Sequence, residues 1–220
     1  MLSNFYLAYT QCKDVIDYME IDITSVIGLE ENVIEKCVPN TLALNSINIV
    51  RDIILVPRRV LYVNNDNIDE CLASTEKAII GCIPLDTSSA RRLAKIGKVF
   101  TVVLTPKNYR YADESQINIM AQSTKPKYVE VHLYPFVSHI LSEDLSIDVE
   151  KELYLLGNVI EHALRKDVGV VLSAASIELK KTLLATHMDL ILYALGFSKR
   201  ERRLMLEMYP MDLLRRWLNL

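Results

Sequence analysis

The chain has 220 residues and half of them are hydrophobic, so it can bury the core of one large α/β domain without metals or disulfides. This composition excludes a disordered protein. The net charge of −3 argues against a free-standing nucleic-acid binder, because affinity for RNA comes largely from neutralised phosphates. Residues 1–90 hold 6 basic and 13 acidic side chains, whereas residues 91–220 hold 19 and 15. We therefore expect any RNA-facing surface in the later part, and the acidic first part is free to meet a basic partner protein.

The sequence shows no sign of a membrane or secretory segment. The apolar run at residues 5–9 lacks the basic flank of a signal peptide, and no run approaches the roughly 18 to 20 apolar residues that span a bilayer. We therefore expect a cytoplasmic protein without membrane contact. The cysteines form no CxxC pair and no Cys/His set at zinc-site spacing, which predicts buried or half-buried free thiols. They are Cys12, Cys37, Cys71 and Cys82.

The first half of the chain alternates short apolar runs with turns and helical segments. Strands are predicted at residues 5–9, 41–44, 53–56 and 60–63, and helices at 30–37 and 68–75. Residues 13–27 fit either a strand or a helix. Pro39 stops the first of these helices, and the turn at 64–67 supplies an N-cap for the second.

The second half repeats one pattern, a buried strand followed by a helix. Strands are predicted at 78–83, 99–104, 128–133 and 168–172, and helices at 84–94, 112–122 and 149–165. Lys180 and Lys181 open a further helix that Gly196 ends, and Ser198 starts the last one. Strands that alternate with helices through short connections predict a parallel sheet, and about seven such units fit a closed or nearly closed TIM-like (β/α) barrel. No linker or repeat divides the chain, so we expect a single α/β barrel domain over residues 1–220.

The order of elements in the later part resembles the archaeal ribonuclease P protein component 3 family, whose relatives are subunits of eukaryotic ribonuclease P and MRP. The matching features are the strand 170–172, the small loop Ser173-Ala174-Ala175, a basic position at Lys180 or Lys181, the helix end at 194–197, and a later helix that ends at Tyr209-Pro210. A proline followed by basic residues, at 57–59, is a second point of resemblance. Ala174 stands where the family has glycine, and lysine stands where it has arginine. The resemblance runs from about Pro57 to Pro210.

That resemblance implies a fold and a function. The fold is a distorted TIM-like barrel related to the polymerase and histidinol phosphatase superfamily. The function is that of a non-catalytic subunit of ribonuclease P, which removes the 5′ leader of precursor tRNA. In the family, the RNA subunit with its bound magnesium performs the hydrolysis, and the protein binds no cofactor. The implied partners are the ribonuclease P RNA and protein component 2, with precursor tRNA met indirectly.

The residues by themselves supply no coherent active site. The four histidines, which form no HxH or HExxH motif, are His132, His139, His162 and His187. Ser173 and Ser176 lie outside any GxSxG elbow, so we interpret them as parts of a structural loop. Three carboxylates follow or lie in predicted strands, but no spacing joins them: Asp22, Asp86 and Glu130.

Clustered basic residues point more clearly to a function, which is RNA binding. One guanidinium group can bind two phosphate oxygens, and lysine adds a point charge. The predicted RNA-binding residues are Arg58, Arg59, Arg91, Arg92, Lys98, Lys180 and Lys181. A solvated helix face is the competing interpretation for each cluster. The family resemblance implies RNA contact at Arg91, at Lys98, and at Lys180 or Lys181.

Three functions stay open at this point. The first is the ribonuclease P subunit, with no active site of its own. The second is a metal-dependent barrel phosphoesterase of the polymerase and histidinol phosphatase superfamily. The third is a protein scaffold without RNA contact.

Overall fold

The fold is built on a parallel sheet that curls into a nearly closed barrel. The computed structural model describes residues 1–39, 42–44, 47–73, 77–96, 101–111, 113–123, 125, 127–140 and 149–219. Seven strands follow one another around the barrel in the order β1 (Ser3–Leu7), β2 (Val26–Glu30), β5 (Ile53–Val63), β6 (Ile79–Pro84), β7 (Thr101–Leu104), β8 (Tyr128–His132) and β9 (Gly169–Ser173). Every neighbouring pair along this path is parallel. The predicted TIM-like arrangement is therefore confirmed.

Backbone hydrogen bonds join the two end strands of this sheet where β1 and β9 finish. The Ala175 N–H donates to the Tyr6 carbonyl at 2.9 Å, and the Ala8 N–H donates to the Ser176 carbonyl at the same distance. These bonds satisfy edge groups that an open sheet would leave unpaired. They hold the barrel shut at the carboxyl ends of its strands.

Two short antiparallel strands, β3 (Leu42–Leu44) and β4 (Ile47–Val50), extend the sheet beside the start of β5. The strand predicted at 41–44 thus exists, apart from Thr41, which is outside the described residues, but it belongs to a hairpin. The two runs predicted at 53–56 and 60–63 are one continuous strand. Pro57 is tolerated inside it because β5 pairs with β4 as far as Leu55 and with β6 only from Arg58 onward.

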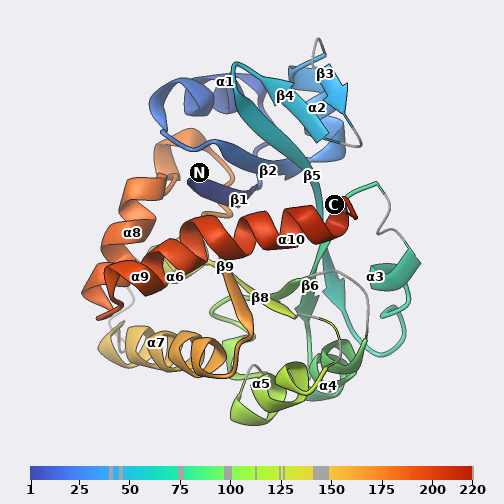
Figure 1. Cartoon of the computed structure of the whole chain (residues 1–220), viewed down its shortest axis with the longest axis vertical. Coiled ribbons are helices and arrows are strands. Elements are labelled where there is room, and N and C mark those ends of the chain that lie inside the picture. Colours follow the sequence, from blue (N-terminus) through green and yellow to red (C-terminus); the bar gives the residue numbers. More distant parts are fainter. Residues whose placement is uncertain are drawn as a thin grey trace.

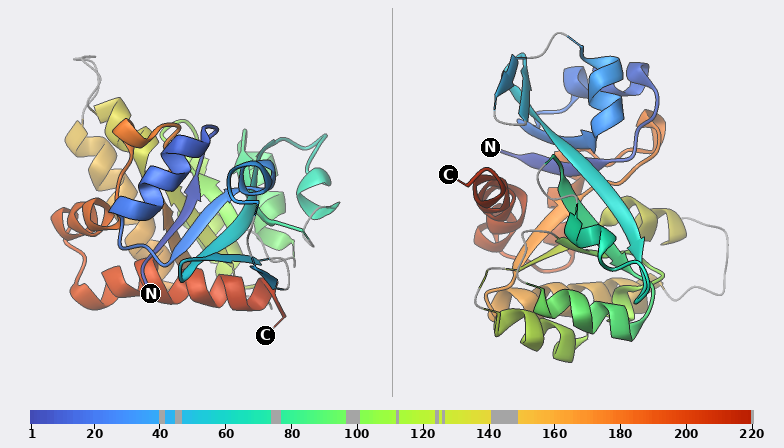
Figure 2. Two further views of the ribbon diagram at one scale, coloured as in Figure 1. Left: turned by 90° about the horizontal axis from the view of Figure 1, so that it is seen from above. Right: turned by 90° about the vertical axis from the view of Figure 1, so that its right-hand side faces the viewer.

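Helices cover the outside of the barrel (Figures 1 and 2). They are α1 (Cys12–Ile21), α2 (Glu31–Cys37), α3 (Glu70–Ala73), α4 (Thr87–Lys95), α5 (Glu114–Ala121), α6 (Leu133–Ile140), α7 (Val149–Arg165), α8 (Ala185–Ala194), α9 (Lys199–Arg203) and α10 (Tyr209–Trp217), with 3-10 turns η1 (Tyr109–Tyr111) and η2 (Leu179–Lys181). The ambiguous stretch 13–27 resolves into a helix and then a strand. Of the helix predicted at 68–75, the described residues form one turn, α3, and residues 74 and 75 lie outside them. The helix α6 was not predicted. Among the described helices, none is long and apolar enough to cross a membrane.

Side chains of the strands alternate between an outer layer and the barrel interior. Outward residues such as Val102, Val129 and Val170 pack under α4, α5, α7 and α8. A second cluster lies beneath α1 and α2. Inward residues at the amino ends of the strands meet Leu213 and Trp217, so α10 closes that end of the barrel (Figure 1).

The last helix does not end at Pro210, as the family resemblance had implied. It runs from α9 through a π-helical turn, η3 (Leu204–Met208), into α10. Proline has no N–H to offer the carbonyl four residues earlier, which belongs to Leu206. The hydroxyl of Ser3 donates to that carbonyl at 2.7 Å. The π turn and this bond from β1 let the helix continue across the barrel.

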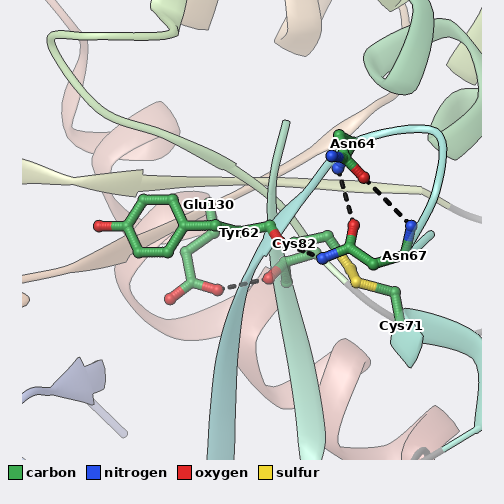
Figure 3. Close-up of a disulfide and its surroundings, with 7 residues drawn as sticks. Tyr62, Asn64, Asn67, Cys71, Cys82 and Glu130 are labelled. Atoms are coloured by element: carbon green, nitrogen blue, oxygen red, sulfur yellow. Dashed lines mark hydrogen bonds between the residues drawn. A yellow bond between two sulfur atoms is a disulfide. The ribbon is translucent and has the colours of Figure 1, made fainter. Parts of the chain in front are cut away.

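The prediction of free thiols is wrong for all four cysteines. Cys12 at the start of α1 is bonded to Cys37 at the end of α2, with Cα atoms 4.8 Å apart. Cys71 is bonded to Cys82 of β6, with Cα atoms 6.5 Å apart (Figure 3). Sequence spacing could not show these pairs, because the partners meet only when the helices pack beside each other and against the sheet.

Candidate functional site

Polar side chains fill the centre of the barrel. Arg58 on β5, Thr101 on β7, Glu130 on β8 and Ser173 on β9 are all fully buried. On β7, β8 and β9 the apolar residues next to them, such as Val102, Val129 and Leu172, point outward to the helices, because successive residues of a strand face opposite sides. The barrel therefore encloses a charged group and its partners rather than a purely apolar core.

Glu130 is the centre of this buried network. One carboxylate oxygen pairs with the Arg58 guanidinium and accepts the Thr101 hydroxyl at 2.5 Å. The other accepts the Ser173 hydroxyl at 2.6 Å, and Nε2 of His132 lies 3.4 Å from it. Burial alone would raise the pKa of the Glu130 carboxyl, but these partners, Arg58 above all, outweigh burial and lower that pKa. Glu130 is thus held as a carboxylate and acts as an internal counter-ion.

Two glycines make room for the Arg58 side chain. A Cβ on Gly28 would lie 2.8 Å from Cγ of Arg58, and one on Gly81 would lie 3.3 Å from Nη2. The Phe5 ring lies 4.9 Å from the guanidinium carbon, in cation–π geometry. Arg58 has no accessible surface. A phosphate outside the protein therefore cannot reach its guanidinium, so we correct the place of Arg58 among the predicted RNA-binding residues.

A cavity of about 830 Å³ opens at the carboxyl ends of the barrel strands. It lies above the buried network, since His132, two residues beyond Glu130 on β8, forms part of its wall. Its lining is mostly apolar and aromatic and comes from β1, β5, β6, β8 and the segments that follow β7 and β9. The residues used below are Tyr6, Tyr62, Lys107, Tyr111, His132 and Ala175. Barrels of this kind place their binding sites at this end.

The predicted basic residues do not form one surface. Arg91 on α4 is engaged by both oxygens of Asp113, each 2.6 Å from Nη2, and so ties α4 to the start of α5. Arg92 donates to the carbonyl of Asn65 at 3.0 Å. Arg59 is exposed on the outward side of β5. Lys98 lies outside the described residues.

Lys180 and Lys181 lie in the 3-10 turn η2 and not, as predicted, at the start of the helix that Gly196 ends. The following helix, α8, begins four residues later. Both lysines are exposed, and Lys181 pairs with Glu178. The turn packs beside α1, whereas α4 packs beside α5 on another side of the barrel (Figure 1).

The possible catalytic residues do not converge. Asp86 caps α4 by accepting the Ser89 N–H at 2.7 Å, and Asp22 accepts hydroxyls of its own neighbourhood, Tyr18 and Thr24. Within the described part of the chain, no three His, Cys, Asp or Glu side chains lie close enough to hold a metal ion. Of the histidines, His132 is buried against Tyr6 with ring centroids 5.4 Å apart. The side chain of His139 is outside the described residues.

Sequence reasoning missed both the buried network and the cavity. A signal was present, since Glu130 and His132 alternate with valines in β8, which places them on one face of the strand. That the face is the barrel interior, and that Arg58 lies opposite, depends on the order of strands around the barrel. Nothing in the sequence indicated that Tyr62 and Tyr111 line one cavity, because Tyr62 lies on β5 and Tyr111 in η1.

The fold and these sites define a nearly closed parallel α/β barrel with a cavity at the carboxyl ends of its strands. No protein-family model matches the sequence, and no curated protein matches it. The fold is similar to a chain in the cryo-EM structure of an archaeal ribonuclease P with mature tRNA. The TM-score is 0.69 at 10% sequence identity, and the aligned part covers 99% of this chain and 90% of that one.

Proposed function

We propose that this protein is a subunit of ribonuclease P, of the component 3 type, which assists the catalytic RNA in removing the 5′ leader of precursor tRNA. The observation that carries the proposal is the similarity to a chain of an archaeal ribonuclease P over 99% of the length. The order of sequence features from Pro57 to the helix end at 194–197 supports the same family independently. A relation to the polymerase and histidinol phosphatase superfamily is part of this proposal.

The protein would act by binding, with hydrolysis left to the RNA and its magnesium. Its partners would be the ribonuclease P RNA and protein component 2, in the cytoplasm. The acidic segment 1–90 would face the basic partner, and the basic later part would face RNA phosphates. A phosphoesterase is not favoured, because Asp86 and His187 cap helices and, within the described residues, no three His, Cys, Asp or Glu side chains lie together as metal ligands.

The RNA-contacting residues that we propose are those of the predicted set other than the buried Arg58. Lys180 is the strongest, because it is exposed on η2 beside Lys181. Arg59, Arg91, Arg92 and Lys98 stay in the set as weaker proposals. Arg91 would have to exchange Asp113 for a phosphate, which lowers its net contribution.

Reconstitution tests this function directly. Ribonuclease P RNA and component 2 are combined with and without this chain, and precursor tRNA cleavage is measured at moderate magnesium. We expect stimulation by the chain. Absence of both stimulation and component 2 binding would refute the proposal, and metal-dependent phosphatase activity of the isolated chain would favour the alternative.

A double variant tests the proposed RNA contacts. Lys180→Ala with Lys181→Ala should weaken RNA engagement and reduce the slope of log K against log salt by up to about 2, since each phosphate contact contributes close to 1. Component 2 binding should stay unchanged. The control is Lys166→Ala, just after the end of α7, which removes another exposed lysine from outside the set. Equal loss of RNA and component 2 binding would indicate misfolding instead.

A further inference from the structure

The cavity at the carboxyl ends of the strands has the size and lining of a ligand site. Its volume of about 830 Å³ lies within the roughly 300–1,000 Å³ of small-molecule sites. Aromatic rings line it at two depths. Tyr6 and His132 are stacked on each other near the buried network, and Tyr62 and Tyr111 lie farther along the wall. Tyr62 keeps 65% of its surface exposed, so a large aromatic face is available to a planar ligand.

The charges around this cavity select for an anion. Among the described lining residues, Lys107 is the only lysine, arginine, aspartate or glutamate, and it is exposed. The nearby carboxylate of Glu30 accepts the Tyr6 hydroxyl at 2.9 Å and does not line the cavity. Glu130 below is neutralised by Arg58. A ligand here would therefore find aromatic faces and one ammonium group.

The segment that carries Lys107 and Tyr111 is held in place before any ligand arrives. The Asn108 side chain accepts the Thr105 N–H at 2.7 Å and donates to the Val103 carbonyl at 2.9 Å. The Tyr111 N–H donates to the Asn108 carbonyl at 2.9 Å. Such bonds reduce the ordering cost of binding. Across the mouth, Asn67 donates to the Tyr62 carbonyl at 3.0 Å and fixes the end of β5 (Figure 3).

The opposite wall contains a strained residue. Ala175 has φ of 53°, a left-handed conformation that is unfavourable for any residue with a side chain. Its N–H is used to close the barrel on Tyr6. Strain of this kind persists where the surrounding structure enforces it, and it is concentrated at ligand sites.

We propose that this cavity binds a single unpaired nucleotide, with the base against Tyr62 and Tyr111 and the phosphate at Lys107. Stacking accepts any base, because every base has an aromatic face. A free mononucleotide and an unstacked nucleotide of an RNA share this chemistry. The proposal does not rest on the ribonuclease P function, because the cavity would take either source.

The isolated full chain is titrated with adenosine 5′-monophosphate by calorimetry and with a labelled single-stranded oligoadenylate by fluorescence anisotropy. Tyr62→Ala should weaken binding about fivefold or more, the lower limit for loss of one stacked base. Tyr62→Phe keeps the ring and should bind as the wild type does. Lys107→Ala should weaken binding and flatten its salt dependence.

Matched controls are Tyr154→Ala on α7, where the tyrosine is 68% exposed, and Lys95→Ala on α4. Both should leave binding unchanged. Binding of both probes with loss in Tyr62→Ala supports a general nucleotide site, and binding of the oligonucleotide alone supports an RNA nucleotide.

No binding of either probe to the wild type overturns the proposal. So does binding that is insensitive to Tyr62→Ala and Lys107→Ala but is lost in the Lys180→Ala, Lys181→Ala variant, since the nucleotide would then lie at η2. Stimulation of precursor tRNA cleavage is measured separately with the Tyr62→Ala variant. If the wild type binds no nucleotide but the Tyr62→Ala variant still stimulates cleavage fully, the cavity site is refuted and the ribonuclease P function is not.

Discussion

Replacing Glu130 with leucine should destabilise the protein severely. The change keeps a side chain of similar size inside the barrel but removes the carboxylate that pairs with Arg58. The guanidinium would be left buried without a counter-ion, because it has no accessible surface through which water could reach it. Two hydroxyls, those of Thr101 and Ser173, would lose their acceptor as well.

The expected loss is about 4 kcal/mol or more. Breaking a buried ion pair from one side costs about 3–5 kcal/mol, and each orphaned hydroxyl adds up to about 1–3 kcal/mol, with incomplete additivity. Domains are stable by only about 5–15 kcal/mol, so this one change removes a large share of the total. The double variant Arg58→Met, Glu130→Leu should recover the part of the loss that comes from the uncompensated charge, about 3–5 kcal/mol, whereas the two hydroxyls stay without their acceptor.

Urea unfolding followed by tryptophan fluorescence measures both variants. Trp217 is the only tryptophan, is 9% exposed, and packs against the closed end of the barrel. Its emission therefore reports on barrel unfolding. A loss below about 1 kcal/mol in Glu130→Leu, or a double variant no more stable than the single one, would refute the assignment of Arg58 and Glu130 as a structural pair. If Arg58 makes no RNA contact, the folded double variant should also keep wild-type RNA affinity.

Three further outcomes follow from the same structure. The pKa of Glu130 is lower in the folded than in the unfolded protein. The stabilisation by its carboxylate is therefore present above the unfolded pKa near 4.5 and is lost as the pH falls toward the folded pKa. Glu130→Gln should flatten this acid dependence of the unfolding free energy. Ala175→Gly should raise stability by up to about 1 kcal/mol in thermal unfolding, because relief of the left-handed strain exceeds the added chain entropy, and an unchanged or lower Tm would contradict the strain. Ser3→Ala should cost about 1–2 kcal/mol, because it removes the donor to the buried Leu206 carbonyl, whereas Ser138→Ala, on a half-buried hydroxyl of α6, serves as its control.

Local patterns in the sequence were sufficient for most of the elements and for the class of fold. Continuous apolar runs such as 168–172 and the apolar periodicity of 149–165 predicted β9 and α7 almost to their ends. Ser198 marked a helix start that the structure confirms, because an N-cap depends only on residues within one turn. The alternation of strands and helices then predicted a parallel barrel.

Interactions between distant residues needed the tertiary structure. Whether Pro210 ends a helix depends on a hydroxyl from Ser3, more than 200 residues away in sequence, and on a π turn that no local pattern announced. Whether Arg58 is exposed or buried also depends on residues distant in sequence. Next to Arg59 it has the sequence signature of a phosphate-binding pair, but β5 turns one of the two to the solvent and the other toward Glu130.

The sequence by itself determined which segments are strands and helices, where charge accumulates along the chain, and that the strands form a parallel sheet. Only the tertiary structure decided which charges are available to a partner, because alternate strand residues face opposite sides and the barrel closes over one of them. It also decided where a ligand can bind. The cavity exists because the ends of separate strands and loops meet, and no one of them carries its chemistry alone.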